Sequence, residues 1–148
     1  MHKFSNSMSY VTLGVDDLER AVVFYRDGLG LKTKGIVGSE LDHGAVAFFD
    51  FQPGLKLALW PRKSIAEECN VSASKPDPAA FMLAHNVPTR AHVDDIIAQA
   101  RDAGAVIVRP PKGFAWGGYG GVFQDPDQHL WEVVWNPHDG SGEPDEVC

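Results

Sequence analysis

The chain has 148 residues, of which 44% are hydrophobic and 22% charged, an ordinary composition for a compact globular protein. Its formal net charge is −7 and it has no basic cluster, so neither nucleic acid nor a membrane surface is expected as a partner. Two cysteines, Cys69 and Cys148, are too few for a disulfide framework and favour a cytoplasmic location. No apolar run approaches the roughly 20 residues that a membrane-spanning helix needs.

The first half begins with residues 1–7, a short N-terminal extension. A strand is predicted over 8–15, where apolar and polar side chains alternate. A helix over 17–29 follows, with Asp16 or Asp17 as its cap and glycines at its end. The remaining elements expected in this half are a loop or hairpin strand around 32–39, strands over 44–51 and 55–60 joined at the Gln-Pro-Gly turn, and a short helix capped by Ser64.

The second half follows a linker over 72–80, which contains two prolines and no periodic pattern. Its expected elements are a strand over 81–87, a helix over 90–103 capped by Thr89, a strand over 105–110 broken by Pro110 and Pro111, a glycine-rich loop over 112–121, and a final hairpin of 122–124 and 129–135. Residues 138–148 are polar and acidic, so we expect a disordered tail there.

The two halves resemble each other. Each begins with a strand that ends in valine, Val15 or Val87, and each continues into a helix that ends at a glycine, Gly30 or Gly104. Arg-Asp-Gly-Leu-Gly in the first half is matched by Arg-Asp-Ala-Gly in the second. We interpret this as an internal duplication. It predicts an α+β fold of two tandem βαβββ modules, over 8–71 and 81–137, that form a curved mixed sheet around a cup-shaped site.

Three stretches carry a resemblance to a known family, and the middle one is LKLALWPR followed by the second strand and helix, which fits in order and spacing. VTLGVDDLERAVVFYRDGLGL resembles the opening strand and helix of the vicinal oxygen chelate superfamily, and AWGGYGGVFQDPDQHLWEVVWNP resembles its closing hairpin. The family's Asp-Pro-Asp-Gly turn is present as Asp125 to Gln128. Members include glyoxalase I, extradiol dioxygenases, fosfomycin-resistance enzymes and bleomycin-resistance proteins. The resemblance covers about residues 8–137 and implies the fold more strongly than the function, because this fold serves enzymes and binding proteins alike.

The resemblance also implies where a metal would bind. Enzymes of the family hold a divalent ion with one side chain from each of four strands, and the matching positions here are Tyr10, Ala58, Met82 and Glu132. Only Glu132 is a suitable ligand, since alanine cannot coordinate and a methionine thioether is too soft for hard divalent ions. We therefore expect no cofactor. The alternative is a divalent metal held by Glu132 with ligands assigned elsewhere, such as His43. His85 is expected to be structural, on the side of the helices.

Strand alternation predicts which side chains face the cup. They are Tyr10, Thr12, Lys56, Ala58, Trp60, Met82, Ala84, Asn86, Leu130, Glu132 and Val134, and the loop with Trp116 and Tyr119 is expected to fold over the mouth. Such a surface is apolar and aromatic with few polar groups, as is typical of sites for organic molecules. The alternative is a structural role, in which the aromatic side chains only fill the cup and pack a dimer.

Glu132 is the most informative single residue. A carboxylate among apolar neighbours is paired, hydrated or neutral. A contact with Lys56 across the cup, a role as general base, and a solvated position at the rim are the three interpretations.

Three functions remain open at this stage. The favoured one is a metal-free protein that binds or sequesters a hydrophobic or aromatic compound. The alternatives are a metal-dependent lyase, isomerase or dioxygenase of the glyoxalase type, and a metal-free enzyme that uses Glu132 as its base. The family resemblance further implies a homodimer.

Overall fold

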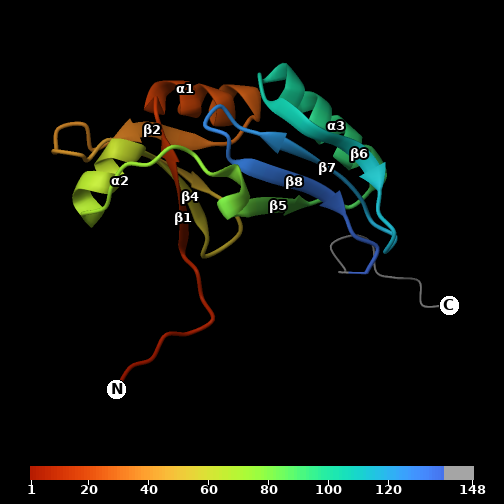
Figure 1. Ribbon diagram of the computed structural model, residues 1–148, viewed down its shortest axis with the longest axis horizontal. Helices are drawn as coiled ribbons and strands as arrows, with labels where there is room; N and C mark the ends of the chain where they lie inside the picture. The colour runs from red at the N-terminus through yellow and green to blue at the C-terminus, as the bar shows by residue number, and fades with distance from the viewer. Residues whose placement is uncertain (139–148) are drawn as a thin grey trace. The chain divides into compact units, whose positions relative to one another are not determined.

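The structure is a computed structural model that describes residues 1–138 (Figure 1). Its contacts divide the chain into two compact units, one of Met1–Arg26 with Gly30–Ser74, and one of Asp27–Leu29 with the chain from Lys75 onward. The expected bounds of the extension, modules and linker stay predictions. The expected acidic tail lies, apart from His138, outside the described residues.

The first unit contains a four-stranded mixed sheet with the strand order β1-β4-β3-β2. The edge strand β1 pairs with β4 in parallel, and the other neighbours are antiparallel. Its elements are β1 (Tyr10–Val15), α1 (Leu18–Val22), the π-helix η1 (Val23–Gly28), β2 (Thr33–Val37), β3 (Val46–Asp50), β4 (Lys56–Pro61) and α2 (Arg62–Cys69).

The second unit repeats this arrangement with the strand order β5-β8-β7-β6 and a parallel pair of β5 and β8. Its elements are the 3-10 helix η2 (Pro78–Ala80), β5 (Met82–Asn86), α3 (Arg90–Asp102), β6 (Val106–Gly113), β7 (Tyr119–Gln124) and β8 (Leu130–Trp135). The α+β class with two βαβββ modules is therefore confirmed, and each module has a mixed sheet of its own. Among residues 1–138, no helix is both long and apolar enough to cross a bilayer.

The core of the first unit lies between its sheet and the helical segment α1–η1. Leu13, Leu59 and Phe49 point to this side from three neighbouring strands, and none of them has any exposed surface. The ring of Tyr25 on η1 lies 6.0 Å from that of Phe49, which fixes this face as the helix side. We call the opposite side of each sheet, which carries the alternate side chains, its open face.

The core of the second unit lies between its sheet and α3, which covers β6, β7 and β8 (Figure 1). Gly121 and Val133 pair in register, and a Cβ atom built on Gly121 would lie 3.2 Å from Ile97 of α3. Phe123 and Trp131 stack on the same side with centroids 6.3 Å apart. Trp131 is thus a core residue, as its position in the strand predicts.

Both helix caps at the start of the modules form as expected. The side chain of Asp17 accepts a hydrogen bond from the backbone of Arg20, and that of Thr89 accepts one from His92. The expected helix over 17–29 changes at Val23 from an α-helix to a π-helix. A π-turn rotates less per residue, so the consecutive Phe24 and Tyr25 both reach the core.

The predicted cap of the second helix is wrong. α2 begins directly after β4 at Arg62, so Ser64 lies within the helix and is buried rather than capping it. The residue at the cap position is Pro61, whose side chain offers no acceptor.

The predicted break at Pro110 and Pro111 is also wrong. β6 continues through both prolines to Gly113, and its pairing with β7 skips from Arg109 to Lys112. β6 is the edge strand of its sheet, where proline is tolerated because no second neighbour needs the missing N–H. The expected glycine-rich loop therefore shrinks to 114–118.

We predict that the two faces of β3 contribute very differently to stability. Replacing the fully buried Phe49 with alanine should lower the free energy of unfolding by about 3–5 kcal/mol in a urea titration. The same change at its neighbour Phe48, which is 40% exposed on the open face, should cost about 1 kcal/mol. Equal losses would contradict the assignment of the two faces.

Candidate functional site

The open face of the first sheet carries two rows of side chains across β1, β4 and β3. In register the rows are Tyr10, Lys56, Asp50 and Thr12, Ala58, Phe48. Four of the five positions predicted on β1 and β4 lie in these rows, and the fifth, Trp60, follows on the same face in register with Gly14, because residues paired in a sheet point to the same side. Tyr10 and Phe48 are 52% and 40% exposed, so this face presents aromatic surface.

Tyr10 and Phe48 form an aromatic pair above β4. Their ring centroids are 5.9 Å apart with an interplanar angle of 67°, an edge-to-face arrangement. Ala58 pairs in register with Thr12 and Phe48, whereas Tyr10 belongs to the neighbouring row opposite Lys56. Ala58 is only 2% exposed, so it is buried although it lies on the side of the sheet away from α1.

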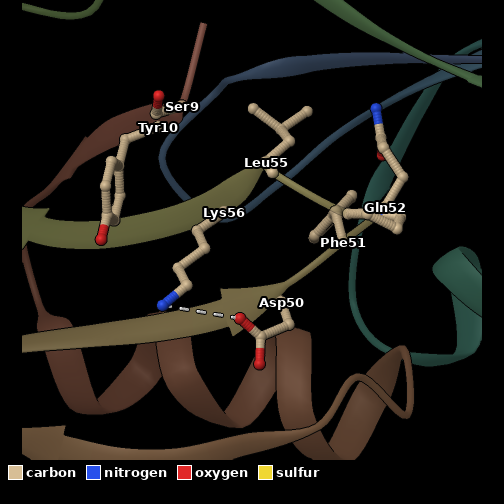
Figure 2. A pocket seen from close by; sticks show the side chains of 9 residues that line it. Ser9, Tyr10, Asp50, Phe51, Gln52, Leu55 and Lys56 are labelled. Atoms are coloured by element: carbon tan, nitrogen blue, oxygen red, sulfur yellow. Dashed lines mark ion pairs between the residues drawn. The ribbon is translucent and has the colours of Figure 1, made fainter.

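Two cavities open on this face. One of about 350 Å³ lies at the turn between β3 and β4, where Figure 2 shows Tyr10, Lys56 and Asp50 around it. Its lining residues run from Asp50 to Lys56, together with Ser9 and Tyr10. The other, of about 410 Å³, lies toward β2 and is lined by Lys32, Thr33, Lys34, Gly35, Val37, Phe48, Asp50 and Lys56.

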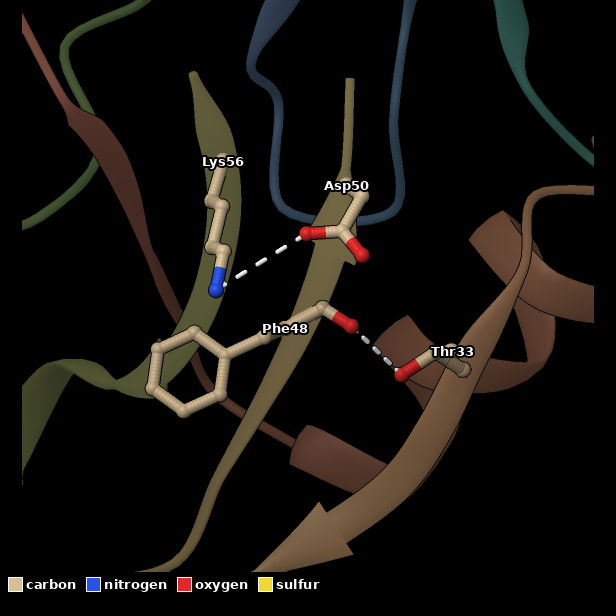
Figure 3. A network of polar contacts seen from close by, with 4 residues as sticks. All are labelled: Thr33, Phe48, Asp50 and Lys56. Atoms are coloured by element: carbon tan, nitrogen blue, oxygen red, sulfur yellow. Dashed lines mark hydrogen bonds and ion pairs between the residues drawn. The ribbon is translucent and has the colours of Figure 1, made fainter. Parts of the chain in front are cut away.

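The second cavity is positively charged on balance, since three lysines and one aspartate line it. Figure 3 shows Lys56 turned toward Asp50, with an Nζ–Oδ1 distance of 3.8 Å. The same view shows the hydroxyl of Thr33 donating to the backbone carbonyl of Phe48 at 2.7 Å, which ties β2 to β3. Both partners of the ion pair are well exposed, at 48% and 84%, so the pair contributes little to stability.

The far end of this face is closed by α2. A Cβ atom on Gly14 would lie 2.9 Å from Cγ of Arg62, so a larger residue would collide with the helix. Trp60, which pairs with Gly14, donates its indole N–H to the carbonyl of His43 at 2.8 Å. The ring of His43 lies 3.2 Å from the hydroxyl of Ser64. Trp60 is therefore half-buried and anchored through its indole N–H, and its role in ligand binding stays a prediction.

The open face of the second sheet is built around Glu132. This side chain lies in register between Ala84 on β5 and Val122 on β7 and is half-buried. The neighbouring rows place Met82 beside Leu130, and Asn86 beside Val134. Met82 is 47% exposed, so apolar surface again surrounds the one carboxylate.

Trp116 and Tyr119 were both expected in a loop over the mouth of the cup, but only Trp116 lies in a loop. Trp116 is 50% exposed and stacks on Phe114 in the loop between β6 and β7. Tyr119 instead begins β7 and its hydroxyl donates to Asp94 of α3 at 2.6 Å. That hydrogen bond raises the pKa of Tyr119, and it places the ring on the helix side, away from the open face. The error came from extending the glycine-rich loop to 121.

The proposed contact between Lys56 and Glu132 stays a prediction. Lys56 belongs to the first unit, where its ion-pair partner is Asp50. Glu132 belongs to the second unit.

The family model that matches this chain is that of the glyoxalase/bleomycin resistance protein/dioxygenase superfamily, over residues 7–133. The chain belongs to this superfamily. No protein of curated function matches it significantly.

Solved structures of the superfamily resemble this one closely. A glyoxalase-related enzyme from Fulvimarina pelagi is 29% identical, covers 90% of each chain and has a TM-score of 0.78. A glyoxalase/bleomycin resistance protein/dioxygenase from Nocardioides is 26% identical over 90% of this chain and 85% of its own, with a TM-score of 0.71. A lactoylglutathione lyase from Agrobacterium tumefaciens, 20% identical over 92% of this chain and 98% of its own, shares the fold with a TM-score of 0.67.

The four positions that hold metal in superfamily enzymes do not fit a divalent ion here. Tyr10 and Ala58 face one side of the first sheet, and Met82 and Glu132 face one side of the second. Ala58 has no donor and is covered, and the other three offer one carboxylate between them. Within either unit, the described residues bring no three histidine, cysteine, aspartate or glutamate side chains close enough for a metal site.

Several residues of the open faces were missed from the sequence. Phe48 and Asp50 alternate with buried neighbours on β3, so the rule used for the other strands would have found them. Arg109 and Phe114 were missed because the prolines between them looked like the end of a strand.

We predict that protonation of His85 destabilises the protein. His85 pairs with Val133 on the helix side of β5, and although the residue keeps exposed surface, burial of part of its ring lowers its pKa from the usual 6.5. Because the unfolded chain then binds the proton more readily, the free energy of unfolding should fall as the pH drops below about 6.5.

Urea titrations across this pH range should show that His85→Gln removes part of the loss. A pKa of His85 at or above 6.5 in an NMR titration would contradict the expectation.

Proposed function

We propose that this protein binds an apolar, aromatic organic compound without the help of a metal ion. The observation that carries the proposal is the Tyr10 and Phe48 ring pair on the same face as the buried Ala58, which stands at a position where superfamily enzymes place a metal ligand. Aromatic rings and alanine favour apolar ligands, whereas a metal site needs several donors at the same place.

The cavities of the first unit support this proposal. At about 350 and 410 Å³ they fall in the size range of sites for small organic molecules. Tyr10 contributes an aromatic wall to the first cavity and Phe48 to the second, and Lys56 lines both. An aromatic ligand would stack on these rings, and Lys56 would orient a polar group.

A second candidate is a metal-free enzyme in which Glu132 acts as a general base. Glu132 lies half-buried between Ala84 and Val122, and a ligand on this face would lie within reach of its carboxylate. Sequestration predicts stoichiometric binding and no turnover. Base catalysis predicts turnover that the Glu132→Gln variant loses.

The assembly and location form part of the same proposal. β1 and β5 are edge strands of their sheets, and exposed apolar side chains such as Tyr10 and Met82 lie on them. Pairing of such edges in a homodimer would cover this surface. The exposed thiol of Cys69 is consistent with a reducing cytoplasm.

The proposal predicts that a neutral naphthyl probe binds at the ring pair. N-phenyl-1-naphthylamine fluoresces strongly in apolar surroundings, so its titration should give a saturable curve with about one site per chain. Tyr10→Ser should weaken binding about tenfold, because it removes an aromatic wall of the cavity.

The matched control is Val71→Ser, which removes an apolar side chain of similar exposure, 59%, just after α2. It should leave the affinity unchanged. An unsaturable signal, or equal effects of the two substitutions, would refute binding at this site.

A further inference from the structure

Arg109 shares the open face of the second sheet with Glu132. In register Arg109 pairs with Val122, and Val122 pairs with Glu132 on its other side. The two charged residues are therefore two strands apart, or about 10 Å between their backbones.

The guanidinium group of Arg109 lies beneath an aromatic stack. Its Cζ atom is 4.1 Å from the ring centroid of Phe114, and Phe114 stacks on Trp116 at 5.3 Å with an interplanar angle of 9°. A Cβ atom on Gly120 would lie 3.3 Å from the ring of Phe114, so this stack covers the same open face. Trp116 forms the outer, half-exposed end of the stack.

One edge of this guanidinium group has donors without acceptors. Nε and Nη2 of Arg109 are buried, and neither donates a hydrogen bond to any residue from 1 to 138. The Phe114 ring favours the positive charge but offers no acceptor for an N–H. Buried donors that stay unsatisfied are unfavourable, and most proteins avoid them.

We propose that the Nε and Nη2 edge of Arg109 binds a carboxylate on the ligand. This inference rests on the proposed function, because it takes the same class of apolar, aromatic compound and assigns the site of its carboxylate within the second unit. The two N–H groups along one guanidinium edge match the two oxygens of a carboxylate, which gives a bidentate ion pair.

The surrounding residues fix how such a ligand lies. Its apolar body lies along Val122 and Leu130, and repulsion from Glu132 keeps the carboxylate at the Arg109 side. Because protein atoms cover the donors, Phe114 and Trp116 turn aside when the ligand enters. Trp116 emission therefore changes on binding.

The test compares two probes of nearly the same shape, 2-naphthoate and its neutral amide, 2-naphthamide. Calorimetric titration of the full chain at pH 7 should show naphthoate binding at least tenfold more tightly. Arg109→Met, which keeps an unbranched side chain against Phe114, should weaken naphthoate binding at least tenfold and naphthamide binding less than threefold. The same substitution at the exposed Arg101 of α3 is the control and should change neither affinity.

Each outcome either supports or overturns the assignment of Arg109 as the carboxylate-binding residue. If both probes bind equally, or if Arg109→Met keeps the preference for naphthoate, the assignment of Arg109 is overturned while the proposed function stands. If neither naphthyl probe nor N-phenyl-1-naphthylamine binds, the proposed function fails as well. Should Arg109→Met not fold by circular dichroism, Arg109→Lys, which keeps the charge but not the paired N–H edge, should show an intermediate loss for naphthoate alone.

Discussion

The structure depends on one constraint, the one-sided covering of each sheet by its helices. Successive side chains of a strand point to opposite sides, so the burial of Leu13, Phe49 and Leu59 against α1 and η1 fixes Tyr10, Phe48 and Lys56 on the other side. A register slip of a single residue would exchange the two sets, which the cost of exposing the core forbids. The residues that alternate with the core residues along each strand thus determine which apolar and charged side chains the open face presents.

The same constraint explains where the four metal-ligand positions of the superfamily lie. They lie on β1, β4, β5 and β8, the strands that form the parallel pair of each sheet. In this chain the β4 position is the buried Ala58, and on the same face Tyr10 and Phe48 form a ring pair that contributes about 0.5–1.5 kcal/mol beyond its buried area. At these four positions, where other members of the superfamily hold a metal, this chain offers one carboxylate, Glu132.

Most of the fold could be predicted from the sequence, because period-two alternation and glycine-ended helices mark both modules. The candidate site was predicted less well. Tyr10, Lys56, Met82 and Glu132 follow from alternation, but Tyr119 was placed on the wrong side because the glycines around it resemble a loop. Arg109 was missed because its strand continues through two prolines, which only an edge position permits. Phe114 and Trp116 stack on it through loop geometry that no periodic pattern records.

The central claim is that the open faces bind an organic ligand and no metal ion. It is tested most directly by the metal content of the purified protein after equilibration with manganese, nickel and zinc salts and removal of the excess, measured by mass spectrometry of the elements. The account predicts well below one ion per chain for every metal, because the superfamily positions offer a single carboxylate. One tightly held ion per chain, lost in the Glu132→Gln variant, would contradict it.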